Sequence, residues 1–209
     1  MTFGNTLEDN DQASATSAFT NNGDFLIVGV DETANSVTGV SYNGAAMTQI
    51  GTVLTHTAYA RFVTLWGLAG ATNDGSPHNI IISGGANWII FALSVDGVDQ
   101  TTPYTGLNTA SGTGASPTIA VTTTVDNAYV LAMGLIQTGV TPGANTTMVI
   151  DGTGTSDFYF LRSTNAVSPA GSFTINTNST AGEYDIFAIG INPPGSTAPV
   201  IRSSLLLSI

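Results

Sequence analysis

Short apolar runs alternate with polar turn residues along almost the whole chain. Most runs are rich in Val, Ile, Thr, Phe and Tyr and are bounded by Gly, Asn, Asp or Pro. This pattern is typical of strands separated by turns, and helical periodicity is hard to find anywhere. It predicts strands over 14–19, 25–31, 37–42, 47–54, 60–68, 78–83, 88–95, 118–123, 128–137, 146–150, 157–162, 172–176, 184–191 and 200–208.

The segments between these strands carry specific turn signals. Asn43-Gly44 lies between two predicted strands and predicts a type I′ hairpin, because both central residues of that turn need positive φ. The run 73–77 (NDGSP) predicts a loop. The segment 100–116 is rich in Gly, Thr and Ser and is interpreted as a long connection that crosses between sheets.

Two kinds of strand are distinguishable by their side-chain pattern. In 61–66, Phe62, Thr64 and Trp66 face one way and the intervening residues the other, whereas 89–93 is apolar on both faces. A strand of the second kind lies at the centre of a sandwich or against a neighbouring subunit, and we favour the centre. We therefore expect an all-β fold, a jelly-roll-like two-sheet antiparallel β-sandwich that forms one domain over residues 1–191.

The end of the chain differs from the rest. Residues 192–199 contain three prolines and predict a semi-rigid hinge, because proline cannot donate to a strand ladder. The apolar segment 200–209 must dock, either on its own sandwich or as an added strand on another subunit. The candidate assembly contacts in this segment are Val200, Ile201, Arg202, Leu205, Leu206, Leu207 and Ile209.

Composition narrows the classes of partner. The 209 residues are 42% hydrophobic, which suffices for a core, but only 8% are charged and the net charge is −11. Three arginines and no lysine cannot form a basic stripe, so nucleic acids and acidic membranes are poor candidates. There is no cysteine, hence no disulfide or Cys-based metal site. Residues 1–11 do not resemble a secretory signal peptide, and no apolar run is long enough to span a bilayer.

Candidate catalytic residues are few. The two histidines, His56 and His78, lie in no recognisable motif, and the sequence has no nucleophile elbow, phosphate-binding loop or zinc-protease signature. Acids occur close together at Glu8 with Asp9 and Asp11, Asp31 with Glu32, Asp96 with Asp99, and Glu183 with Asp185. Because most of them fall at predicted turns or strand ends, we expect local backbone hydrogen bonding rather than catalysis, and we predict no enzymatic activity.

Ligand binding has two further candidates. Calcium is the one metal worth considering, because 8–11 and 151–157 are rich in oxygen ligands, although neither matches a known calcium loop; such an ion would brace a loop, and we assign no metal ligands and no cofactor. An aromatic platform for carbohydrate would draw on Tyr59, Tyr104 and Tyr159, for which burial or edge packing is the competing interpretation.

Three segments together resemble a known family. They are 25–30 (FLIVGV) followed by 37–51 (VTGVSYNGAAMTQIG), then 64–68 (TLWGL), and then 92–103 (ALSVDGVDQTTP). The chain resembles, over roughly 13–193, the β-sandwich module of bacterial surface proteins and of tailed-phage and metagenomic virion proteins. The resemblance implies a display or adhesion scaffold without catalytic residues.

The resemblance and the chain's plan together set an expectation of function. With no signal peptide in the sequence, we expect a virion structural protein, such as a capsid decoration, head-fibre or tail-associated protein, that assembles as a homo-oligomer with itself and other virion proteins. The alternative is a carbohydrate-binding or adhesion module of a bacterial surface, with cell-surface glycans as ligands. An enzyme such as a polysaccharide depolymerase is the least favoured.

Overall fold

The fold consists of antiparallel strands in four sheets. The computed structural model describes residues 1–10, 13–137, 139–152 and 157–195, which contain seventeen strands and no helix. Two five-stranded inner sheets have the orders β1-β9-β3-β7-β6 (first inner sheet) and β10-β17-β12-β15-β14 (second inner sheet). Two outer sheets have the orders β2-β8-β4-β5 (first outer sheet) and β11-β16-β13 (second outer sheet).

The strand bounds follow the chain. They are β1 (Thr2–Asp9), β2 (Thr16–Phe19), β3 (Phe25–Glu32), β4 (Gly39–Tyr42), β5 (Ala45–Ala46), β6 (Thr48–His56), β7 (Arg61–Ala69), β8 (His78–Ser83), β9 (Ile89–Asp96), β10 (Tyr104–Gly114), β11 (Thr118–Thr122), β12 (Tyr129–Ile136), β13 (Thr141–Pro142), β14 (Thr146–Asp151), β15 (Asp157–Ser163), β16 (Ser172–Asn178) and β17 (Gly182–Ile191).

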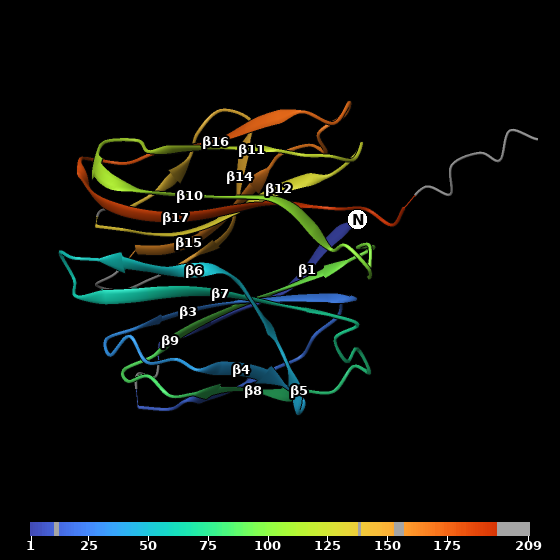
Figure 1. The fold of residues 1–209 in the computed structure, drawn as a ribbon, viewed down its shortest axis with the longest axis vertical. Helices are drawn as coiled ribbons and strands as arrows, with labels where there is room; N and C mark the ends of the chain where they lie inside the picture. Colours follow the sequence, from blue (N-terminus) through green and yellow to red (C-terminus); the bar gives the residue numbers. More distant parts are fainter. Residues whose placement is uncertain (11–12, 138, 153–156, 196–209) are drawn as a thin grey trace, which may run out of the picture.

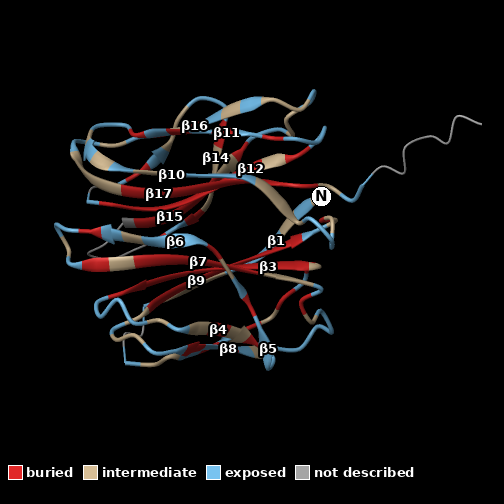
Figure 2. Ribbon diagram, in the orientation of Figure 1, coloured by how far each residue is buried: buried red, intermediate tan, exposed pale blue. Residues whose placement is uncertain are grey.

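The four sheets are stacked as layers. Figure 1 shows the outer sheets at the two ends of the long axis and the inner sheets between them. Each half of the chain thus forms a sandwich of one outer and one inner sheet, and the two sandwiches meet through their inner sheets. Figure 2 shows that buried residues concentrate in the two middle layers. The predicted all-β antiparallel sandwich is confirmed, with four sheets in place of the expected two.

The two halves have the same topology. β1, β9, β3, β7 and β6 occupy the same places in the first inner sheet as β10, β17, β12, β15 and β14 in the second. The outer orders β2-β8-β4 and β11-β16-β13 also correspond. The chain therefore contains an internal structural repeat of two equivalent halves.

The strand registers extend this equivalence to single residues. Phe25 pairs with Val95 in the first half, and Tyr129 pairs with Ile191 in the second. Aligning these pairs places Ile90-Phe91-Ala92 opposite the identical Ile186-Phe187-Ala188. This short identity is the trace of the repeat in the sequence.

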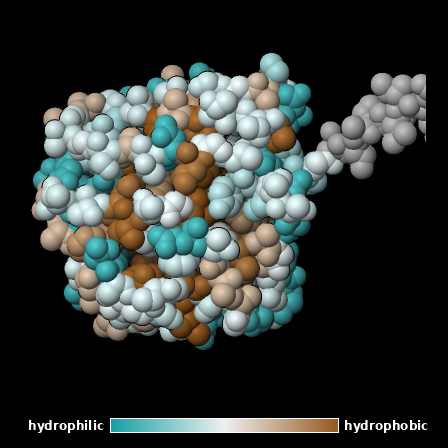
Figure 3. Space-filling model, viewed as in Figure 1, coloured by the Kyte–Doolittle hydropathy of each residue, from teal (hydrophilic) through white to brown (hydrophobic). Residues whose placement is uncertain are grey.

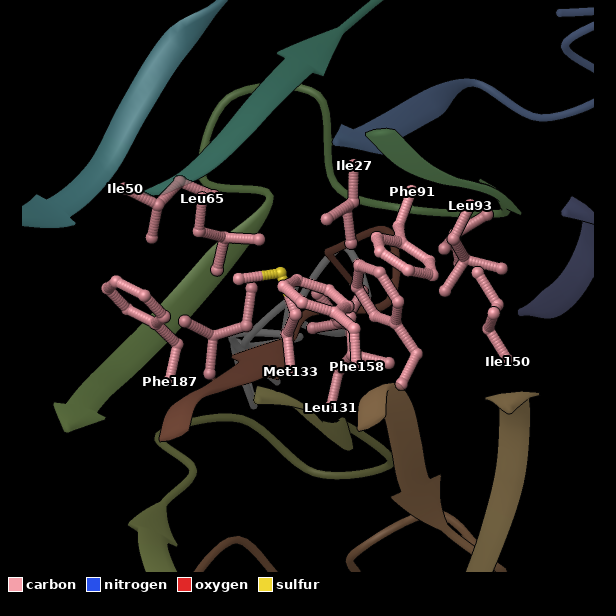
Figure 4. Close-up of a cluster of buried hydrophobic side chains, with 14 of the residues drawn as sticks. Ile27, Ile50, Leu65, Phe91, Leu93, Leu131, Met133, Ile150, Phe158 and Phe187 are labelled. Carbon is pink, nitrogen blue, oxygen red and sulfur yellow. The ribbon is translucent and has the colours of Figure 1, made fainter. Parts of the chain in front are cut away.

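The central core lies between the inner sheets. It contains buried side chains from β3, β6, β7 and β9 and from β12, β14, β15 and β17. Figure 4 shows aromatic and aliphatic side chains from both sheets meeting in one layer. The rings of Phe91 and Phe158 stack across it, with centroids 4.0 Å apart and an interplanar angle of 7°. Because side chains of both halves fill the same space, the two sandwiches share this core.

Two further cores lie inside the individual sandwiches. One is built around Tyr42, Trp66 and Ile80 in the first half, and the other around Tyr159, Leu161 and Ile175 in the second. The inner sheets thus have a core on each face. This explains strands such as β3, β9, β12 and β17, whose residues are buried almost throughout. The central placement predicted for 89–93 is confirmed.

Most local predictions agree with the structure. Every predicted strand within the described residues has a counterpart, and β8 has the predicted bounds. Asn43 (φ 48°) and Gly44 (φ 77°) both have positive φ in the β4–β5 hairpin, as a type I′ turn requires. In β7, Val63 and Leu65 face the central core and Trp66 the outer one, so the predicted alternation is also confirmed.

One prediction needs correction, and one strand was missed. Residues 104–114 of the predicted connection form β10, an edge strand of the second inner sheet; β1, its equivalent, was not predicted either. Both are edge strands with a bulge and with mostly exposed or half-buried polar residues, so they lack apolar alternation. At the start of the predicted hinge, Asn192 donates to Pro103 O and Thr102 O, and Gly195 N donates to Asp99 Oδ2. Residues 196–199 lie outside the described residues, so the hinge stays a prediction. The described residues contain no helix that could reach across a bilayer.

Candidate functional site

Two of the acidic side chains that sequence analysis paired, Glu32 and Asp99, fix loops. The carboxylate of Glu32, only 1% exposed, accepts from the backbone N–H groups of Ala34, Ser36, Val37 and Ala86. This ties the loop after β3 to the one before β9.

Asp99 and Glu8 also accept local hydrogen bonds. Asp99 accepts from the N–H groups of Thr101 and Thr102, and Asn10 donates to Glu8. Local backbone hydrogen bonding, the expected role of these acids, is thus observed for Glu32 and Asp99. Asp11 lies outside the described residues.

Glu183 and Asp185 differ from the other pairs because a histidine from the other half joins them. His56 ends β6, and both acids lie near the start of β17. One ligand atom from each of the three residues can be chosen so that all lie within 4.8 Å of one another. His56 is fully buried, Asp185 is 1% exposed and the Glu183 side chain is 15% exposed. The group (hereafter the junction site) lies where the two sandwiches meet.

The His56 ring has one satisfied and one unsatisfied nitrogen. Nε2 lies 3.2 Å from the Glu183 carbonyl oxygen, and the ring stacks on Tyr59 with centroids 5.0 Å apart. Nδ1 has no hydrogen-bond partner among the described residues; its nearest anionic neighbour is Glu183 Oε2 at 3.9 Å. The ring is therefore fixed in orientation while Nδ1 is available.

Hydrogen bonds from neighbouring residues fix both carboxylates in place. Thr57 donates to Glu183 Oε1 through its N–H (2.6 Å) and its hydroxyl (2.7 Å), and Ala58 N–H donates to Oε2 at 2.6 Å. Ser111 Oγ donates to Asp185 Oδ1, while Asp185 Oδ2 has no partner among the described residues. Glu183 thus connects the β6–β7 turn of one half to β17 of the other.

The two carboxylates have opposite pKa shifts. Burial raises the pKa of Asp185, even though the hydrogen bond from Ser111 and the nearby His56 act to lower it. Burial opposes ionisation of Glu183 as well, but the hydrogen bonds from Thr57 and Ala58 outweigh it and hold the pKa of Glu183 below its ordinary value. Glu183 is therefore the more firmly ionised of the two.

A buried ion pair lies beside the junction site. Arg61 Nε donates to Asp31 Oδ1 at 2.8 Å, and both side chains are almost fully buried. Burial raises the pKa of Asp31 to about 6, although the hydrogen bond and charge of Arg61 lower it and His56 also contributes. Asp31 Oδ2 has no partner among the described residues. Asp31 and Glu32, adjacent in sequence, thus have separate roles.

The other candidates from the sequence do not gather into a site. His78, at the start of β8 in the first outer sheet, pairs with Asp74 at 3.0 Å. Neither residue belongs to the junction site. Tyr159 is 1% exposed and packs in the core, so it cannot contribute to an exposed aromatic platform. Tyr104 is half-buried and stacks on Phe25, and Tyr59 stacks on His56. Residues 153–156 of the second calcium candidate, and all of the predicted contacts Val200 to Ile209, lie outside the described residues.

Sequence reasoning paired Glu183 with Asp185 but did not connect them to His56. His56 and Glu183 are 127 positions apart in the sequence, and only the packing of the two halves brings them together. The one available signal was the internal repeat: Asp185 pairs with Leu135 and aligns with Ile89, so a carboxylate stands where the other half has a buried apolar residue.

The fold defines the class of this protein as an all-β antiparallel sandwich built from two equivalent halves with one shared core. Protein-family models, curated proteins and solved structures gave no match to the chain.

Proposed function

We propose that the chain is a non-enzymatic structural protein of a virion, in which the double sandwich is a rigid body and copies associate through their outer sheets. The virion setting rests on the resemblance carried by 25–30, 37–51, 64–68 and 92–103. Association between copies rests on the distribution of charge, described next.

The observation that carries the proposal is that the two outer sheets are free of charged side chains. The strands β2, β4, β5, β8, β11, β13 and β16 contain no Asp, Glu, Lys or Arg, and His78 is their one titratable group apart from Tyr42. The acids lie instead in inner strands and loops. In a chain of net charge −11, these faces are where two copies can approach with the least electrostatic repulsion.

The side chains on these faces suit contact with a second copy. Ile81, in the middle strand of the first outer sheet, is 41% exposed and lies between Thr16 and Ser41 of the adjacent strands. The second outer sheet presents short residues such as Ala120 and Thr174 to solvent. Figure 3 views the stacked sheets from the side: pale residues are common on this side, brown apolar residues lie in its middle, and strongly hydrophilic residues form small scattered groups. Flat faces of short, uncharged side chains lose little entropy when buried.

The test is self-association of the purified full chain, measured by sedimentation velocity over a range of concentrations. We expect oligomers that Ile81→Glu dissociates, because the change places a carboxylate at the centre of the contact. Val53→Glu is the matched control: Val53 is 37% exposed on β6, an edge strand of an inner sheet, and this variant should associate like the wild type.

Several outcomes would contradict the proposal. A wild-type chain that stays monomeric at the highest concentration, or equal behaviour of the two variants, would exclude association through the outer sheets. Removal of 200–209 separates the contribution of that segment, because the outer-sheet contact predicts oligomers in its absence. Specific binding on a glycan array would favour the adhesion module instead, and turnover of a capsular polysaccharide would favour an enzyme.

A further inference from the structure

The tautomer of His56 follows from its hydrogen bond. The Glu183 carbonyl oxygen can only accept, so the Nε2 atom 3.2 Å from it carries the hydrogen. In the neutral ring the lone pair is then on Nδ1, the nitrogen without a hydrogen-bond partner. A histidine whose one ring N–H is bound to a backbone carbonyl, and whose other nitrogen is free, has the arrangement found in metal ligands.

The two carboxylates are arranged in the same manner. Each is oriented by hydrogen-bond donors: Ser111 for Asp185, and Thr57 and Ala58 for Glu183. Asp185 Oδ2 is buried and unpartnered, like His56 Nδ1. Thus three potential ligands each have an orienting hydrogen bond, and two of them keep a buried polar atom that no described residue satisfies.

The spacing suits a small ion. Ligand atoms at about 2.0–2.2 Å from a zinc ion are separated by roughly 3.3–4.2 Å from one another, depending on the angle. The three residues of the junction site offer atoms within 4.8 Å of one another. The widest separation would have to shorten by at most about 1.5 Å to complete the coordination. Glu183 is the most exposed of the three, so a further ligand such as water can approach from its solvent-exposed side.

The fold itself does not require a carboxylate at this place. The equivalent position in the first half is Ile89, which packs in the central core. A buried carboxylate with an unsatisfied oxygen costs free energy that an isoleucine would not. This cost indicates that Asp185 has a role other than packing.

We propose that His56, Glu183 and Asp185 bind one divalent transition-metal cation of the Zn²⁺ class, which joins the two sandwiches. One imidazole nitrogen and two carboxylate oxygens form a borderline donor set that suits Zn²⁺, whereas Ca²⁺ prefers six to eight oxygens. The ion would also offset the two carboxylate charges, since Arg61 is already paired with Asp31. The site is independent of the proposed association through the outer sheets.

The test uses the full chain, freed of metal with a chelator, and Zn²⁺ as the probe. Competition with a chromogenic chelator should give one Zn²⁺ per chain, and His56→Gln and Asp185→Asn should each weaken binding by at least about tenfold. His78→Gln is the matched control, because His78 also faces a carboxylate (Asp74) but lies on the first outer sheet. It should bind Zn²⁺ like the wild type.

A second measurement covers the case in which a buried variant fails to fold. Co²⁺ added to the wild type should give the visible absorption of nitrogen–oxygen coordination, and Glu183→Gln, at a partly exposed position, should abolish it. The proposal is overturned if Zn²⁺ does not bind, if binding is lost in His78→Gln but kept in His56→Gln, or if Ca²⁺ binds as tightly as Zn²⁺. Absence of binding together with protonation of both His56 nitrogens, seen by NMR, would show an imidazolium–carboxylate cluster instead.

Discussion

Gly29 lies directly across the central core from Met133, and a Cβ atom at residue 29 would overlap the Met133 sulfur. The two residues occupy equivalent places in the repeat: Gly29 pairs with Phe91 in the first half, and Met133 pairs with Phe187 in the second. One half therefore leaves the space that the other fills. Two identical halves could not pack in this way at this point.

This relationship predicts that Gly29→Ala lowers the free energy of unfolding by about 1–3 kcal/mol, because the added methyl group overpacks the core. Gly39→Ala is the control, since a Cβ there meets nothing within 4 Å. Both can be measured by urea denaturation. In a Met133→Ala background the cost of Gly29→Ala should shrink, and an equal cost in both backgrounds would show that Met133 is not the obstacle.

Phe91 and Phe158 stack in the core that both halves share. Removing one of these rings should therefore strongly destabilise both halves together. Phe158→Ala should cost about 3–5 kcal/mol, because it opens a cavity in the core that both halves line. Val125→Ala, at an exposed loop position, should change stability by no more than about 0.5 kcal/mol. Far-UV and near-UV signals should give a single transition for the variant as for the wild type. Two separated transitions would contradict a shared core.

The buried Asp31 predicts a specific dependence of stability on pH. Its folded-state pKa of about 6 lies above the ordinary value of 3.8, so the folded protein keeps a proton that the unfolded chain releases. The stabilising contribution is therefore fully present below about pH 4 and is lost as the pH rises through 6. The linkage amounts to on the order of 3 kcal/mol.

The measurement for Asp31 is urea unfolding of the wild type and of Asp31→Asn between pH 4 and pH 7. The stability of the wild type relative to the variant should fall across this range. Any difference in stability between the asparagine and the protonated Asp31 adds an offset that does not vary with pH. Asp96→Asn, at an exposed position, should give a curve parallel to that of the wild type, and a parallel curve for Asp31→Asn would refute the assignment.

Replacement of the Glu32 carboxylate should loosen the loop after β3 and the loop before β9 together. Glu32→Gln replaces one of two accepting oxygens with an NH₂ group that faces backbone donors, and should cost about 1.5–3 kcal/mol. Amide hydrogen exchange should accelerate together at Ala34, Ser36 and Ala86. Unchanged exchange at Ala86 would show that the carboxylate does not connect the loops.

Sequence reasoning located the strands that have one or two apolar faces, because burial imposes a repeat of two residues or a continuous apolar run. It missed β1 and β10 because an edge strand is held by backbone hydrogen bonds on one side and needs no apolar alternation. The number of sheets was not predictable from fourteen expected strands alone. The Ile-Phe-Ala identity at 90–92 and 186–188 would have suggested two equivalent halves.

The junction site was only partly accessible to sequence reasoning. Glu183 and Asp185 are two positions apart in a strand, so their side chains lie on the same face and could be paired from spacing. His56 comes from the other half, and nothing near it in sequence points to β17. Its contact with the two acids depends on how the inner sheets face each other, which is a property of packing rather than of local sequence.

The shared central core has a consequence for how this protein depends on its own concentration. If the two halves were separate chains that met through their inner sheets, they would form this core only above their dissociation constant. Joining the halves in one polypeptide makes that encounter intramolecular, with an effective concentration set by the short connection between β9 and β10. The two halves should therefore remain associated and folded on dilution.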